Sequence, residues 1–203
     1  MGIRIASRTI LSSAVSKIST TDAARNGWGE DCYAYINRFE ELFKQHLGVK
    51  HAVATSSCTG ALHMGLAALG VGPGDEVIVP PWTMCASATA ILHWNAIPVF
   101  ADIEPETFNI DPKSVEANIT PFTKAIMAVD IFGHSCDIDS LMSIAERYKL
   151  KVITDTAQSP GALYKDKLVG TSAHVGGFSL NYHKHIHTGE GGILVTNDDD
   201  IAE

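Results

Sequence analysis

Short apolar runs alternate with stretches of helical periodicity along most of the chain. Residues 36–48, INRFEELFKQHLG, repeat apolar residues every three or four positions and end at a glycine, which predicts a helix. Runs such as EVIVP at 76–80 and KVITD at 151–155 are apolar almost throughout, which is typical of strands buried on both faces. The pattern predicts strands at residues 51–55, 76–80, 97–102, 124–130, 151–155, 174–181 and 191–197. Further helices are predicted between these strands, at residues 59–70, 83–95, 111–119 and 137–150.

Apolar strands separated by helices indicate an α/β fold, with a mainly parallel seven-stranded sheet and helices on both of its faces. We expect an N-terminal arm at residues 1–35 and one domain at residues 36–203. The acidic run in NDDDIAE, at 197–203, is typical of the first turn of a helix. We therefore expect the chain to be a fragment that lacks a C-terminal domain.

The composition argues against several classes of function. The chain has 203 residues and a net charge of −8, without a basic cluster, which disfavours nucleic-acid binding. No apolar run approaches the roughly 20 residues that span a bilayer. The four cysteines are widely spaced and form no C-x-x-C pair, so reduced thiols are favoured over a disulfide framework or a zinc ribbon. We expect a cytoplasmic protein without nucleic-acid or membrane partners.

Three polar groups follow predicted strands and should meet at one edge of the sheet, because ligands of such sheets bind beyond the carboxyl ends of the strands. The small residues Ser57, Cys58, Thr59 and Gly60 precede a helix and could bring backbone and hydroxyl donors to a phosphate. A simple helix cap at Ser57 or Thr59 is the more common explanation of such a loop.

The other two groups are Asp155 and Lys184. A carboxylate at a buried strand end needs a cationic or hydrogen-bonding partner, such as the protonated ring nitrogen of a cofactor, although Asp155 could also be a helix cap. A desolvated lysine amine can form a Schiff base, although an isolated Lys184 could equally be a solvated surface residue. Together the three groups are what pyridoxal phosphate (PLP) needs from a protein, and Ser179 could reach its phosphate as well.

These motifs resemble those of the DegT/StrS-type sugar aminotransferases, a branch of the aspartate-aminotransferase fold. The resemblance runs from about residue 26 to the end and is most specific in GVGPGDEVIVP, DTAQSPGA and FSLNYHKHIHTGEGGILVT. It implies that Lys184 is the Schiff-base lysine and that Asp155 pairs with the pyridine nitrogen. It also implies that Gln158 lies by the ring hydroxyl, and that Ser179 and Thr59 bind the phosphate.

The chain departs from the family pattern at several positions. Cys58 stands where a glycine is common, and Met84 stands where an aromatic residue often covers the cofactor ring, with Trp82 just before it. Either Trp82 or Met84 could cover the ring. Pro160 replaces a usual histidine, so substrate contacts there do not carry over. Some members replace the lysine by histidine and dehydrate sugars, and the presence of Lys184 favours transamination.

The resemblance implies transfer of an amino group, with glutamate as donor, to a nucleotide-linked keto-sugar for polysaccharide or antibiotic sugar synthesis. It further implies a homodimer with a shared active site. Three alternatives stay open: a sugar dehydratase of the same family, a non-catalytic fragment, and a metal site. The metal site would use His183, His185 and His187, which would share one face if NYHKHIH formed a strand.

Overall fold

The computed structural model describes Ala23 and residues 25–29 and 32–203. Most of the expected N-terminal arm, 1–35, therefore lies outside the described residues. The first long helix, α3, spans Cys32–Leu47 and begins four residues before the predicted start at Ile36. The expected boundary between arm and domain thus falls inside this helix.

A seven-stranded sheet forms the centre of the molecule, and its strand order is β1-β9-β8-β5-β4-β2-β3. Neighbouring strands are parallel except where β9 pairs with β1 and β8, so a single strand of this sheet runs against the others. This confirms the predicted mainly parallel sheet. The strands are β1 (His51–Thr55), β2 (Glu76–Val79), β3 (Ile97–Phe100), β4 (Thr123–Val129), β5 (Lys151–Asp155), β8 (Val175–Ser179) and β9 (Gly192–Thr196).

Helices connect the strands where the hydrophobic pattern predicts them. They are α4 (Cys58–Ala68), α5 (Ala86–Leu92), α6 (Pro112–Ala117) and α7 (Ile138–Tyr148), and the acidic run near the end begins α8 (Asp199–Ala202). The side chain of Asp111 accepts the Lys113 N–H and caps α6, with Pro112 in its first turn, as the sequence indicates. Within the described part of the chain, no helix combines the length and apolar character needed to cross a membrane.

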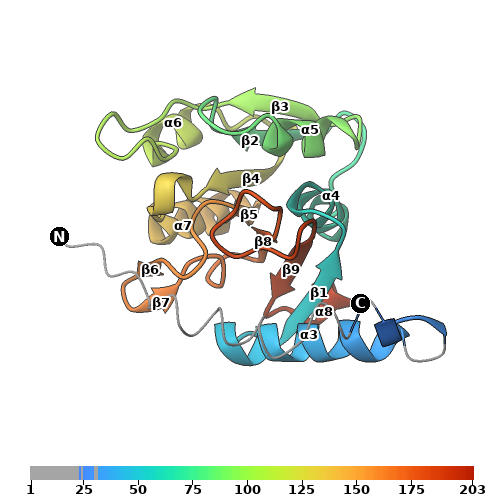
Figure 1. Cartoon of the computed structure of the whole chain (residues 1–203). Coiled ribbons are helices and arrows are strands. Elements are labelled where there is room, and N and C mark those ends of the chain that lie inside the picture. Colours follow the sequence, from blue (N-terminus) through green and yellow to red (C-terminus); the bar gives the residue numbers. More distant parts are fainter. Residues whose placement is uncertain (1–22, 24, 30–31) are drawn as a thin grey trace.

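The helices cover both faces of the sheet, as predicted. Figure 1 shows α4 and α5 on one face and α6 and α7 on the other, with α3 along the edge at β1. Successive side chains of one strand serve opposite faces: Met127 packs in the core under α4 and α5, whereas Ile126 packs in the core under α6 and α7. Strands buried in this way are apolar at nearly every position, which explains their signature in the sequence.

A glycine allows helix α4 to pack closely on the sheet. A Cβ atom at Gly65 would lie 2.7 Å from Cδ1 of Ile153 and 2.9 Å from Cγ1 of Val175, on β5 and β8. An alanine here would therefore force these side chains, or the helix, to move. This close packing positions the N-terminus of α4 near the carboxyl ends of β5 and β8.

A short 3-10 helix at Ile131–Gly133 and a small hairpin were not predicted from the sequence pattern. Strands β6 (Leu163–Tyr164) and β7 (Lys167–Leu168) pair antiparallel outside the main sheet. The turn between them, at Lys165 and Asp166, has φ of 47° and 64°. Turns of this kind usually carry Asn-Gly, so Lys-Asp gives no signal of a hairpin.

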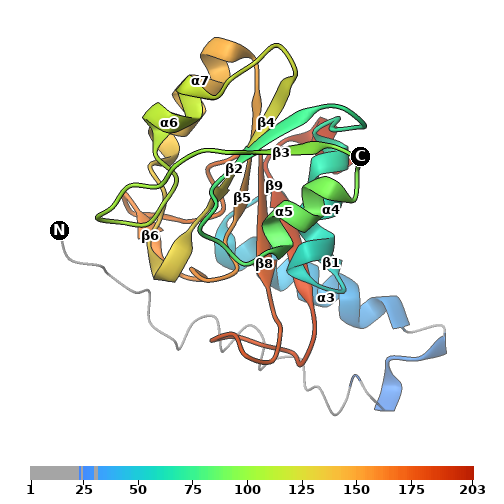
Figure 2. The ribbon, with the colours of Figure 1, turned by 90° about the horizontal axis from the view of Figure 1, so that it is seen from above.

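The connection between β8 and β9 is a closed loop. It joins two neighbouring antiparallel strands and projects beyond their ends (Figure 2). The side-chain amide of Asn181 donates to Glu190 at 2.7 Å, and the Thr188 N–H donates to the Leu180 carbonyl at 3.0 Å. These bonds tie the two ends of the loop together, with Lys184 between them.

Candidate active site

Asp155 ends β5 with its carboxylate buried at the carboxyl edge of the sheet; the residue is 5% exposed. The hydroxyl of Ser87 donates to Oδ2 at 2.8 Å. The other oxygen, Oδ1, accepts the Ala157 N–H at 3.1 Å and faces the thiol of Cys58 at 3.8 Å. Donors from α5, from the turn after β5 and from α4 therefore stabilise one buried negative charge, which would be costly without them.

The N-terminus of α4 lies beside this carboxylate. Ser57 caps the helix by accepting the Gly60 N–H at 3.1 Å, which confirms the cap that the sequence allowed. A Cβ atom at Gly60 would meet only the hydroxyl oxygens of Ser57 and Ser56, at 3.5 and 3.7 Å. The first turn of α4, with Thr59 in it, thus presents N–H groups and hydroxyls around a small open space, which suits an anion.

Cys58, in the first turn of α4, is affected by the charges of both Asp155 and Lys184. Burial raises the pKa of its thiol well above the usual range, the charge of Asp155 adds to the rise, and the charge of Lys184 opposes it. The thiol is therefore neutral and donates to Asp155 rather than acting as a nucleophile. Asp155 ends β5 and Lys184 lies in the loop after β8, and these two strands are parallel neighbours, so both residues lie beyond the carboxyl ends of the strands.

Lys184 is half-buried, and its backbone N–H donates to the Asn181 carbonyl at 2.9 Å in a turn. The neighbouring His183, His185 and His187 are exposed, and the segment contains turns and bends instead of a strand. The pleat that would align the three imidazoles is therefore missing. Over the residues that the structure describes, no group of three His, Cys, Asp or Glu side chains is arranged to hold a metal ion.

The remaining residues expected around the phosphate and ring hydroxyl also follow sheet strands. Ser179 is buried at the end of β8, and its hydroxyl accepts the Asn181 N–H at 3.4 Å. Gln158 lies three residues beyond Asp155, and its side-chain oxygen accepts the Phe132 N–H at 3.1 Å. Gln158 is thus fixed by the segment after β4 and keeps its amide N–H groups for another partner.

Trp82 and Met84 are both strongly exposed, at 51% and 65%, in the segment between β2 and α5. The ring of Trp82 lies 5.8 Å from that of Phe108, which lies 6.1 Å from Phe132. Phe108 and Phe132 have φ of 62° and 54°, a strained conformation for bulky residues that is often found at functional sites. The sequence did not predict a role for either phenylalanine, because no residue pattern indicates a positive φ at these positions.

Asp130, at the end of β4, was also missed. Its buried carboxylate accepts the Thr156 hydroxyl at 2.9 Å and the Cys136 N–H at 3.0 Å, and its own N–H donates to the Asp155 carbonyl at 3.0 Å. Burial raises the pKa of Asp130 to about 6, against the hydrogen bonds from Cys136 and Thr156. Asp130 therefore supports the turn that follows Asp155.

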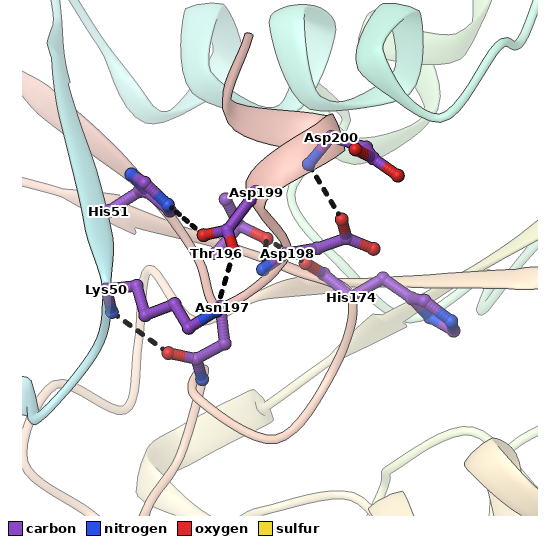
Figure 3. Close-up of polar contacts among 8 residues, drawn as sticks. All are labelled: Lys50, His51, His174, Thr196, Asn197, Asp198, Asp199 and Asp200. Carbon is purple, nitrogen blue, oxygen red and sulfur yellow. Dashed lines mark hydrogen bonds and ion pairs between the residues drawn. The ribbon is translucent and has the colours of Figure 1, made fainter.

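A separate polar cluster lies at the other ends of the strands, away from Asp155 (Figure 3). Asp199, in α8, receives Nζ of Lys50 at 2.9 Å and Nε2 of His51 at 2.8 Å, which ties α8 to the start of β1. His174, just before β8, accepts the Val152 N–H through Nδ1. These contacts join the N-terminal ends of parallel strands and lie a full strand length from Asp155 and Ser179.

Comparison with known proteins places this geometry in a family. The chain matches the DegT/DnrJ/EryC1/StrS aminotransferase family over residues 14–203. It belongs to this family. One relative is GDP-perosamine synthase from Caulobacter vibrioides. The two sequences are 47% identical over 175 residues, which cover 86% of this chain and 47% of that protein. The chain spans about half the length of such relatives.

Solved structures of DegT-type proteins share the fold. The aminotransferase from Psychrobacter cryohalolentis has a TM-score of 0.85 at 36% identity, covering 100% of this chain and 50% of that one. NtdA from Bacillus subtilis, with bound cofactor PMP, has a TM-score of 0.82 at 34% identity, covering 97% and 44%. A variant of GDP-4-keto-6-deoxymannose-3-dehydratase with bound GDP-perosamine has a TM-score of 0.81 at 29% identity, covering 98% and 52%.

The donor set of this DegT-family chain fits a phosphorylated pyridine cofactor. The first turn of α4 offers N–H and hydroxyl groups to an anion, and the space at Gly60 leaves them accessible. The buried carboxylate of Asp155 retains acceptor capacity for a ring N–H. Lys184 supplies a primary amine at the same edge of the sheet.

Proposed function

We propose that this chain is the PLP-binding portion of an aminotransferase that transfers an amino group from glutamate to a nucleotide-linked keto-sugar. The observation that carries the proposal is the buried carboxylate of Asp155, which contacts the N-terminal turn of α4 and lies at the same strand ends as Lys184, because β5 and β8 are parallel neighbours. Membership in the aminotransferase family supports the same activity.

Each residue then has a role that its position allows. PLP, when bound, supplies a ring that withdraws electrons during amino-group transfer. Asp155 would hold the proton on the ring nitrogen, and Thr59 and Ser179 would bind the phosphate. Lys184 would hold the cofactor through its amine; once released, that amine would take the proton from the α-carbon of the amino donor and, in the second half of the reaction, would return a proton to the acceptor carbon.

Gln158 and the segment at Trp82 and Met84 would complete the cofactor site. Gln158 keeps amide N–H groups for the ring hydroxyl, because its oxygen is engaged by Phe132. We assign the cover of the ring to Trp82, since its indole is held in the aromatic series with Phe108. Cys58 would line the floor beside Asp155 as a neutral thiol.

The whole protein would extend beyond this portion. We propose residues 36–203 as the cofactor-binding domain, preceded by an arm, and a homodimer in which each active site draws residues from both copies. The size of the relatives supports the greater length of the whole protein, because they are about twice as long as the chain. The products would serve polysaccharide or antibiotic sugar synthesis.

Dehydration of a sugar is the second candidate, since one similar structure is that of a dehydratase. Lys184 favours transamination, because the resemblance implies that some family members that dehydrate sugars carry a histidine in place of this lysine. With glutamate and a keto-sugar nucleotide, an aminotransferase forms an amino sugar and 2-oxoglutarate, whereas a dehydratase forms a deoxy sugar.

The experiment that tests the proposal is reductive labelling. PLP is added to the purified chain, the product is reduced with borohydride, and peptides are mapped by mass spectrometry. We expect the label on Lys184 and its loss in Lys184→Ala, whereas Lys167→Ala, which removes an exposed lysine of β7, should label normally. Label distributed over surface lysines would overturn the assignment.

A further inference from the structure

Ser87 stands out because it is fully buried, at 0% exposed, and contacts the Asp155 carboxylate, yet the proposed mechanism gives it no role. It lies in the first turn of α5, 68 positions before Asp155 in the sequence, and its hydroxyl reaches Asp155 Oδ2 at 2.8 Å. The same Oγ lies 2.9 Å from the hydroxyl of Thr83. Two hydroxyls and one carboxylate thus form a continuous chain of hydrogen bonds.

The direction of these bonds follows from counting protons. An ionised carboxylate only accepts, so Ser87 must give its single proton to Asp155. Its oxygen can then receive the proton of Thr83. The hydrogen bond to the carboxylate is charge-assisted, and the bond from Thr83 polarises the Ser87 hydroxyl and strengthens it.

The chain of bonds joins two walls of the proposed site. Thr83 lies between Trp82 and Met84, in the segment proposed to cover the cofactor ring, whereas Asp155 lies at the end of β5. We propose that Ser87 is a positioning residue for the Asp155 carboxylate and that, with Thr83, it couples this carboxylate to the ring-covering segment. The inference rests on the proposed function, since it gives Ser87 a role in holding PLP.

The test is a double-mutant cycle on PLP affinity, measured by absorbance titration of the purified chain. Ser87→Ala should weaken PLP binding by about tenfold, the usual consequence of losing one hydrogen bond to a charged group. In an Asp155→Ala background, where the carboxylate is absent, the same substitution should change the affinity by less than about twofold. Thr83→Val keeps the shape of the side chain but removes the hydroxyl that donates to Ser87. It should cause a smaller loss of PLP affinity, and this loss should also disappear in the Asp155→Ala background.

The matched control is Thr89→Val, which removes another hydroxyl from α5; that hydroxyl donates to the Cys85 carbonyl at 2.8 Å. It should leave PLP affinity unchanged, and circular dichroism checks that each variant is folded. Equal losses for Ser87→Ala with and without Asp155 would overturn the inference alone, because Ser87 would then act only on the packing of α5. If Ser87→Ala does not fold, Thr83→Val decides by the same comparison. Failure of the unmodified chain to bind PLP would overturn the proposed function and this inference with it.

Discussion

The carboxylate of Asp155 receives donors from three separate segments, which fixes its orientation but leaves its charge intact. In the proposed mechanism that charge keeps the ring nitrogen of PLP protonated. The shape of the group and its charge can therefore be separated by substitution.

We expect Asp155→Asn to weaken PLP binding without abolishing it, because the phosphate and Lys184 still hold the cofactor. With PLP loaded, exchange of the α-proton of glutamate should slow roughly 100-fold or more, because the developing charge loses its electrostatic partner. The exchange is followed by NMR in heavy water with PLP-loaded protein. Asp111→Asn, which alters a helix cap elsewhere, is the control. An unchanged exchange rate would mean that Asp155 only orders the turn through its bond to Ala157.

Asp130 gives the chain a pH dependence of stability. Burial raises its pKa to about 6, whereas an aspartate in the unfolded chain titrates near 3.9, so the folded state holds the proton to higher pH. Stability is therefore lost as the pH rises from about 4 through about 6, and the loss levels off only near pH 7. We expect the unfolding free energy of the wild type, relative to Asp130→Asn, to fall by about 2 kcal/mol between pH 4 and pH 7. Urea unfolding at several pH values measures it, and parallel curves for the two proteins would contradict it.

Some site residues could be named from the sequence and others could not. Asp155 and Lys184 follow strands that the apolar pattern reveals, and Ser57 has the residue type of a cap. Ser87 could not be found, because its helix is a run of small residues and its role arises from a contact 68 positions away. Phe108 and Phe132 depend on backbone conformations that their residue type disfavours.

At the scale of elements, helix α7 begins with a well-defined cap. The side chain of Asp137 accepts the Ser140 N–H at 3.3 Å and the Tyr164 hydroxyl at 2.9 Å, so it also ties the helix to the β6–β7 hairpin. Asp139, two residues on, makes an exposed ion pair with Lys165. Exposed pairs of this kind contribute little to stability.

We expect Asp137→Ala to lower the unfolding free energy by about 1 kcal/mol, which corresponds to a drop in melting temperature of roughly 2–4 °C for a chain of this size. Asp139→Ala, in the same turn, should cost less. Thermal unfolding followed by circular dichroism compares the two variants. A larger loss for Asp139→Ala would show that the ion pair, and not the cap, stabilises the start of α7.

At the scale of the whole molecule, the sequence predicted the sheet and its helices because buried parallel strands must be apolar at nearly every position. The strand order is a different matter. Which strands are neighbours depends on how helices cross over the sheet, and the antiparallel direction of β9 depends on the loop that carries Lys184. Neither property leaves a periodic trace in the sequence.

The close approach of α4 to the sheet has a consequence for how this sequence can vary. Gly65 lies about two turns from Cys58, yet a side chain added there would press on both Ile153 and Val175. The addition becomes easier when these opposing side chains shrink at the same time; Ile153→Val removes Cδ1 but leaves the contact with Val175. A larger residue at position 65 should therefore occur together with smaller residues at positions 153 and 175, and a survey that changes one position at a time would class Gly65 as more restricted than it is.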